Sequence, residues 1–169
     1  MHECERVYAD RLISNTEIQR CIEIIVDVAK RVIDDDQESL FKQPNAWTTF
    51  ATQTMDDSRA YLPIKSMASL KKVLHDQLNE YNEANAIMNL VLFDMAMLHV
   101  VRIARIIGFP QGNALLVGVG GSGKQSLARL ASFICGNTVT QVAVTSTFGV
   151  NELKEELKEL YRKAGVKPA

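Results

Sequence analysis

Several stretches of the chain space their apolar residues three or four positions apart, as an amphipathic helix does. They cover residues 15–33, 66–84, 124–135 and 151–164. Each stretch therefore predicts a helix that packs one face on a core. The apolar stripes are Ile18, Ile22, Ile25, Ala29 and Val32; Leu70, Leu74, Leu78 and Tyr81; Leu127, Leu130, Ala131 and Ile134; and Leu153, Leu157, Leu160 and Ala164.

Capping residues predict where these helices begin and end. Ser14 and Glu17 match a capping box, in which each side chain accepts the backbone N–H of the other residue. Asn151 suits the start of the last helix. The acidic triplet 34–36 is expected to end the first helix as a solvated turn, and Gly136-Asn137 to end the third.

Residues 86–107 are mostly apolar and long enough to be considered as a membrane span. Asp94, Arg102 and Arg105 interrupt the stretch, and each charge would be costly in the middle of a bilayer. At 100° per residue these charges fall on one side of a helix. We therefore predict a helix that is largely buried in protein and carries a narrow polar stripe.

A connector without visible periodicity separates the first helix from the second. It covers residues 41–65, in which Trp47 and Phe50 are expected to pin a loop to the core. This connector divides the chain into a helical segment, residues 1–40, and a longer segment, residues 66–169.

A further pair of apolar runs predicts strands. Residues 113–118 form a short run without alternation, which is typical of a strand buried on both faces of a parallel sheet. Residues 138–145 are rich in Val and Thr. Together with the helix between them they indicate the first half of an α/β domain. With only two strands its sheet is incomplete, and the edges would be exposed in isolation.

Composition narrows the classes of partner. The apolar share is 47%, the charged share is 23% and the formal net charge is -1, so no general affinity for nucleic acid or anionic membranes is expected. Cys4, Cys21 and Cys135 form no CxxC pair and are odd in number. A reducing cytosolic compartment is therefore favoured over a disulfide framework or a zinc site.

A GxxxxGK motif, Gly118 to Lys124, joins the strand expected over residues 113–118 to the helix expected over residues 124–135. Its glycines permit backbone angles and close approaches that side chains would block, so that loop amides cradle phosphates. The helix N-terminus adds positive charge, and Lys124 reaches the outer phosphates. The alternative is a tight glycine turn without a ligand. The predicted contacts are Gly118, Val119, Gly120, Gly121, Ser122, Gly123, Lys124, Gln125 and Ser126.

The motif departs from its usual form after the lysine. Gln125 occupies the position where a Ser or Thr hydroxyl normally binds Mg²⁺, and Ser126 is rotated from that position by roughly 100°. In addition, no apolar run ending in Asp or Glu follows Thr145 in this sequence. We therefore predict phosphate binding, with Mg²⁺ coordination open, and assign no catalytic and no metal-ligating residue to this chain.

The run from Asn113 to Leu127, which includes the glycine loop and Gln125, resembles the start of the fourth AAA+ module of an axonemal dynein heavy chain. Likeness extends upstream through the helix around Arg102 and the lead-in around Leu74, and downstream through Leu157. The first residues, with His2-Glu3, Arg6-Val7 and Asp10-Arg11, resemble the end of the third module's helical lid.

The resemblance implies a slice of a ring-shaped, ATP-driven motor that acts on microtubules in the axoneme of cilia and flagella. It implies ATP or ADP as the ligand, and the other AAA+ modules, dynein subunits and microtubules as partners of the parent protein. A structural module whose loop is empty or permanently filled with ADP is the alternative. An unrelated P-loop enzyme such as a small kinase fits less well, because of the missing acidic strand and the long helical lead-in.

Overall fold

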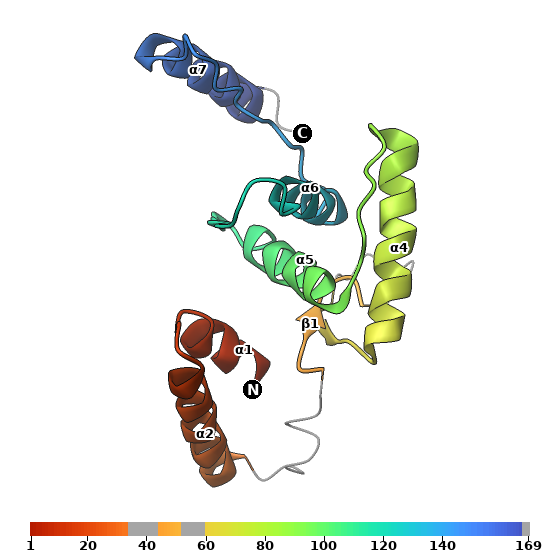
Figure 1. Ribbon diagram of the computed structural model, residues 1–169, viewed down its shortest axis with the longest axis vertical. Coiled ribbons are helices and arrows are strands. Elements are labelled where there is room, and N and C mark those ends of the chain that lie inside the picture. The colour runs from red at the N-terminus through yellow and green to blue at the C-terminus, as the bar shows by residue number, and fades with distance from the viewer. Residues whose placement is uncertain (34–43, 52–59, 167–169) are drawn as a thin grey trace. The chain divides into compact units, whose positions relative to one another are not determined.

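The computed structural model describes residues 1–33, 44–51 and 60–166 (Figure 1). The chain falls into two compact units, residues 1–137 and residues 138–169. Unit 1 contains every element except the last, α7. In chain order the elements are α1 (His2–Cys4), the π-helical turn η1 (Glu5–Ala9), α2 (Asn15–Val32), β1 (Trp47–Thr48), β2 (Leu62–Pro63), α4 (Met67–Ala84), α5 (Asp94–Ile107), α6 (Lys124–Ile134) and α7 (Val150–Val166).

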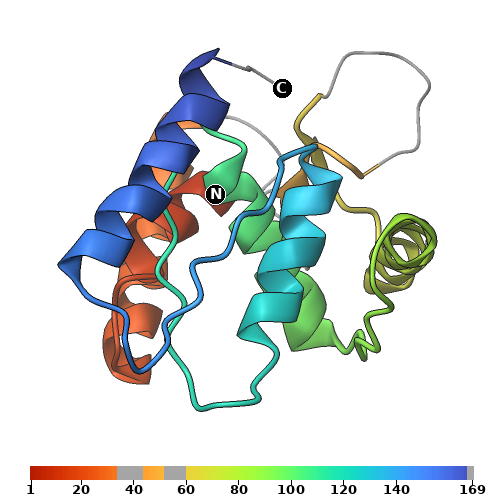
Figure 2. The same cartoon turned by 90° about the horizontal axis from the view of Figure 1, so that it is seen from above.

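The core of unit 1 lies where α4, α5 and α6 contact one another (Figures 1 and 2). The predicted stripes of α4 and α6 face this core, which confirms both helices. Because these apolar side chains leave water together, their burial is the main force that holds the three helices in place. The fully or nearly fully buried members are Leu70, Leu74 and Leu78 of α4, Met97, Val100 and Ala104 of α5, and Leu127, Leu130 and Ala131 of α6.

Helix α4 begins with a capping box that the sequence reading did not identify. The Ser69 amide donates to Ser66 Oγ at 3.1 Å, and the Ser66 amide donates to Ser69 Oγ at 3.2 Å. The box predicted at Ser14 is wrong, although α2 does begin where expected. The Ser14 hydroxyl instead pairs with Thr16 Oγ1 at 2.6 Å, so a local side-chain bond has replaced the cap.

The predicted long helix over residues 86–107 is also wrong in its first part, because α5 begins only at Asp94. Asparagine side chains account for the difference. Asn85 Nδ2 donates to the Tyr81 carbonyl at 3.1 Å, and Asn82 brackets Met88 by accepting its amide at 2.7 Å and donating to its carbonyl at 3.3 Å. These bonds occupy backbone groups that a continuous helix would need.

Among the described residues, no helix combines the length and the apolar character that crossing a membrane requires.

The turn that ends α5 was predicted and is confirmed. The Gly108 amide donates to the Ala104 carbonyl at 2.9 Å, and Gln111 adopts a positive φ of 60°. Gly112 is packed so closely on the end of α5 that a Cβ there would lie 1.7 Å from the Ile106 carbonyl oxygen. The turn therefore fixes where the chain enters the glycine loop.

Part of the connector forms a small sheet, which corrects the expectation that it has no regular structure. β1 pairs antiparallel with β2, with Thr48 opposite Leu62. Thr48 is buried, and Phe50 packs against the core as predicted. Trp47 lies at the surface, with its ring 6.1 Å from that of Tyr61. The acidic triplet 34–36 lies outside the described residues.

The strand expected over residues 113–118 is not formed. Residues 113–118 form no regular secondary structure; Leu116 packs against the core, but Leu115 and Val117 are 91% and 86% exposed. The prediction that both faces are buried is therefore wrong for this chain. A strand needs a neighbour to satisfy its backbone groups, and the only sheet among the described residues is the β1–β2 pair.

Unit 2 consists of an extended lead and α7. The strand expected over residues 138–145 is not formed either, and Val139 and Val144 are exposed. The cap predicted at Asn151 is wrong: α7 begins at Val150, and the Gly149 amide donates to the Glu152 carboxylate at 2.9 Å. The apolar stripe of α7 has no buried member.

Candidate phosphate-binding site

The glycine loop turns through backbone conformations that favour glycine. Gly121 and Gly123 have φ values of 75° and 76°, where residues with a Cβ are strained. Gly123 is also the N-cap of α6, which begins at Lys124 as predicted. The turn thus leads directly into a helix, which is the arrangement that a phosphate loop requires.

The side chain of Lys124 folds back over the loop that precedes it. Its ammonium group donates to the carbonyls of Gly118 and Val119, both at 2.6 Å, and to Ser122 Oγ at 3.0 Å. Gly118 leaves the room for this arrangement, because a Cβ there would lie 3.2 Å from Ser122 Oγ and 3.5 Å from Lys124 Cδ. The loop therefore holds its lysine in a defined place.

The first turn of α6 presents uncapped amides. The first helical bond runs from the Leu127 amide to the Gly123 carbonyl at 2.9 Å, so the amides of residues 124–126 have no partner within the helix. No side chain caps this end. Free amides and the positive end of the helix dipole together favour an anion in front of Lys124.

Helix α6 is anchored firmly behind the loop. Leu130 is fully buried, and the Phe133 ring lies edge-on to the Tyr81 ring of α4 at 5.4 Å. At its far end the Asn137 amide donates to the Ser132 carbonyl at 2.8 Å, with Gly136 at a φ of 74°. This confirms the predicted stop at Gly136-Asn137 and describes a Schellman motif. The candidate site therefore rests on a packed helix with both ends defined.

The predicted contacts thus lie on one short loop and the first turn of α6. Phosphate binding by these residues stays a prediction. Gln125 is exposed and Ser126 is partly exposed. Within the described part of the chain, no group of three or more His, Cys, Asp or Glu side chains is arranged to hold a metal ion.

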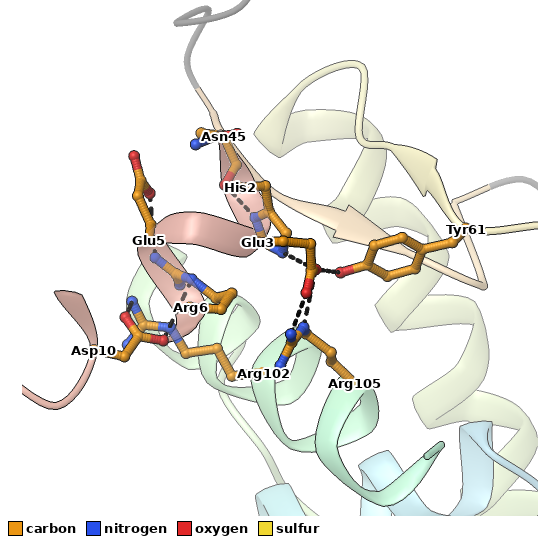
Figure 3. A network of polar contacts seen from close by, with 9 residues as sticks. All are labelled: His2, Glu3, Glu5, Arg6, Asp10, Asn45, Tyr61, Arg102 and Arg105. Carbon is orange, nitrogen blue, oxygen red and sulfur yellow. Dashed lines mark hydrogen bonds and ion pairs between the residues drawn. The ribbon is translucent and has the colours of Figure 1, made fainter. Parts of the chain in front are cut away.

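Sequence patterns did not predict a polar cluster on the side of α5 that carries Arg102 and Arg105 (Figure 3). It centres on Glu3, whose carboxylate accepts hydrogen bonds from Arg105 Nε at 3.0 Å, from Arg105 Nη2, and from the Tyr61 hydroxyl at 3.0 Å. His2 Nδ1 donates to the Asn45 carbonyl at 2.8 Å. The cluster joins the N-terminal helices to α5 and to the residue before β2.

A neighbouring set of charges extends this polar cluster. Arg102 of α5 pairs with Asp10 at 3.4 Å, and Asp10 also pairs with Arg6 at 3.3 Å. The polar stripe predicted on α5 therefore does exist at Arg102 and Arg105, and it contacts protein rather than solvent alone. Its partners lie about a hundred positions earlier in the chain, where spacing gives no signal.

The surroundings shift the acid–base behaviour of the cluster. Hydrogen bonds from Arg105 hold the pKa of Glu3 below its ordinary value. Burial lowers the pKa of His2, whereas burial and the hydrogen bond to Glu3 raise the pKa of Tyr61 to about 12. At neutral pH the cluster therefore contains a charged Glu3, a neutral His2 and a neutral Tyr61.

We expect the free energy of unfolding of unit 1 to fall as the pH drops below 6.5, the ordinary pKa of histidine. His2 takes a proton near 6.5 in the unfolded chain but resists it in the folded one. Its contribution is therefore complete above pH 6.5 and is lost below it. Glu3 adds a further loss only below 4.5, its ordinary pKa. Urea unfolding at a series of pH values measures this.

Matched variants separate His2 from the other titrating groups. His2→Asn keeps a donor near the Nδ1 position but cannot titrate, and should flatten the part of the profile just below pH 6.5. The charges that act on His2, namely Arg6, Glu3 and Arg105, stay in place. His75→Asn, at an exposed position of α4, is the matched control substitution. A full pH dependence in His2→Asn would assign the effect elsewhere.

Comparison with known proteins shows which family the chain is similar to. Residues 88–169 match the family model described as the P-loop containing dynein motor region D4. The chain is 52% identical to the flagellar outer arm dynein beta chain of Chlamydomonas reinhardtii and 48% identical to the ciliary dynein beta chain of Heliocidaris crassispina. It is 46% identical to human dynein axonemal heavy chain 17.

Each of these matches covers 99% of this chain and 4% of the relative, so the chain spans only a short part of such proteins. The matches extend over the N-terminal helices and polar cluster as well as the glycine loop. The chain belongs to the axonemal dynein heavy-chain family.

Proposed function

We propose that this chain binds the phosphates of ATP or ADP through residues 118–126, as part of an AAA+ module. The observation that carries the proposal is the position of Lys124, whose ammonium contacts the loop that leads into the uncapped start of α6. An anion placed there would meet the ammonium, the amides and the helix dipole together.

At the level of the parent protein, we propose an ATP-driven motor that acts on microtubules in the axoneme of cilia and flagella. Its partners would be the remaining AAA+ modules, other dynein subunits and microtubules. Residues 1–40 would belong to the lid of the third module and residues 66–169 to the first half of the fourth. Residues 113–118 and 138–145 would become strands once neighbouring strands satisfy their backbone groups.

A structural module with an empty or permanently ADP-filled loop is the second candidate. It is favoured by a specific feature: all three donors of the Lys124 ammonium already have acceptors within the loop. Gln125 also lacks the hydroxyl that normally holds Mg²⁺. Because these acceptors already pair with the ammonium, the loop does not require a ligand to satisfy its lysine.

Titration of the 169-residue chain with ATP and ADP, with and without Mg²⁺, distinguishes the two. For a nucleotide site we expect Lys124→Ala to weaken binding roughly 10- to 100-fold, the effect of losing charge-assisted hydrogen bonds to phosphate. Lys158→Ala is the matched control, because Lys158 is exposed on α7 and pairs only with Glu155 among the described residues.

The outcomes separate cleanly. ATP-selective, Mg²⁺-dependent binding supports an exchangeable nucleotide site. Equal and Mg²⁺-independent binding of both nucleotides supports a static site. No binding by the unmodified chain, or equal binding by Lys124→Ala, removes the proposed phosphate contact and leaves the structural role.

A further inference from the structure

Lys124 has used every hydrogen-bond donor of its ammonium on the loop itself. Its acceptors are the carbonyls of Gly118 and Val119 and the hydroxyl of Ser122. A lysine ammonium has three donors and no acceptor. A phosphate oxygen therefore cannot receive a hydrogen bond from Lys124 until one of these acceptors gives way.

The three acceptors differ in how readily they can be replaced. The carbonyls belong to the backbone, and both of their bonds are 2.6 Å long. The bond to Ser122 Oγ is longer, at 3.0 Å, and Ser122 is exposed at the crest of the loop. A serine hydroxyl rotates about its side-chain bonds and can donate as well as accept. Exchange at Ser122 requires no movement of the backbone.

Gly118 supports this arrangement from the other side. A Cβ at position 118 would come within 3.2 Å of Ser122 Oγ and 3.6 Å of Lys124 Nζ. The space that this glycine leaves open is thus the space in which the hydroxyl and the ammonium meet. By contrast, a Cβ at Gly120 would meet nothing within 4 Å. The absence of a side chain at Gly118 therefore leaves the room that this contact needs.

We propose that the Ser122 hydroxyl occupies one Lys124 donor and releases it to an incoming phosphate of a nucleoside di- or triphosphate. This inference rests on the proposed nucleotide site. The two carbonyls suffice to place the ammonium, so the Ser122 hydroxyl competes with the phosphate for the third donor, while the backbone of Ser122 stays part of the predicted phosphate loop. Ser122 therefore slows association and leaves dissociation unaffected.

The test is stopped-flow binding of a fluorescent ATP analogue to the unmodified chain, Ser122→Ala and Ser122→Thr. Ser122→Ala frees one donor and should raise the association rate constant about fivefold, the equivalent of one net hydrogen bond. Its dissociation rate constant should stay unchanged. Ser122→Thr keeps the hydroxyl and should behave as the unmodified chain, which excludes a general effect of substitution in the loop.

The kinetic constants also tell a failure of this inference from a failure of the proposed site. Faster dissociation in Ser122→Ala would show that the hydroxyl holds the bound phosphate, and would overturn the inference, as would identical constants in all three proteins. No binding by any of them would overturn the nucleotide site and the inference with it.

A ligand-free readout adds an independent check. Selective ¹⁵N labelling of lysine side chains reports the exchange of the Lys124 ammonium protons with water in the empty chain. The inference requires faster exchange in Ser122→Ala than in Ser122→Thr. Equal exchange would show that the Ser122 contact does not hold the ammonium.

Discussion

Gly112→Ala should destabilise unit 1 by at least about 3 kcal/mol, because the added methyl group would overlap backbone atoms. A Cβ at this position would lie 1.7 Å from the Ile106 carbonyl oxygen, 2.8 Å from the Ile106 carbonyl carbon and 3.1 Å from the Phe109 carbonyl oxygen. All three are backbone atoms, so no side-chain rotation relieves the overlap. The last turn of α5 would have to unwind.

Chemical unfolding measures the loss, and other glycines of the chain supply the controls. Gly120→Ala adds a methyl group with no neighbour within 4 Å and should change the stability by less than about 1 kcal/mol. Gly165→Ala, also in open space and within α7, should be neutral or stabilising by up to about 1 kcal/mol. An equal response in all three variants would mean that α5 and the turn do not pack as described.

Sequence patterns predicted the parts of this chain whose cause is local. The stripe of Leu70, Leu74 and Leu78 specifies a helix and its buried face within a few turns. Glycine at positions 121 and 123 predicts backbone conformations that other residues rarely adopt, and both residues have positive φ values. Such features depend on neighbours in sequence, so a single sequence carries them.

The parts that were missed depend on distant or competing partners. Nothing in the spacing pairs Glu3 with Arg105, which lies 102 positions away, or buries His2 against Asn45. Two hydrogen bonds between the Asn82 side chain and the Met88 backbone interrupt a stretch whose apolar composition predicted a continuous helix. In each case a side chain captured a backbone or charged group that periodicity alone assigns to helix or solvent.

The missing strands have a different cause. The run from 113 to 118 has the composition of a strand. The burial of its side chains alternates, because Leu116 packs against the core and Leu115 is exposed. What it lacks is a hydrogen-bonded neighbour among the described residues. Strand formation is a property of a pair, and a segment can carry the propensity without meeting the partner.

Leu130→Ala should cost about 2–5 kcal/mol of stability, which is the usual range for a leucine at a fully buried site. Leu130 has no exposed surface and lies on the face of α6 that packs against the core behind the phosphate loop. The substitution removes apolar contacts and leaves a cavity between helices. Leu115→Ala is the matched control, because Leu115 is 91% exposed, and its effect should stay within about 0.5 kcal/mol.

The same variant tests whether the loop depends on this core. If nucleotide binds only the folded state, a concentration a hundred times the dissociation constant adds about 2.7 kcal/mol to the free energy of unfolding of any variant with an intact site. Leu130→Ala should therefore recover that amount when measured with nucleotide, as should Leu115→Ala. Lys124→Ala should recover less. A Leu130→Ala protein that loses stability but gains nothing from nucleotide would show that the packing of α6 is itself part of the binding site.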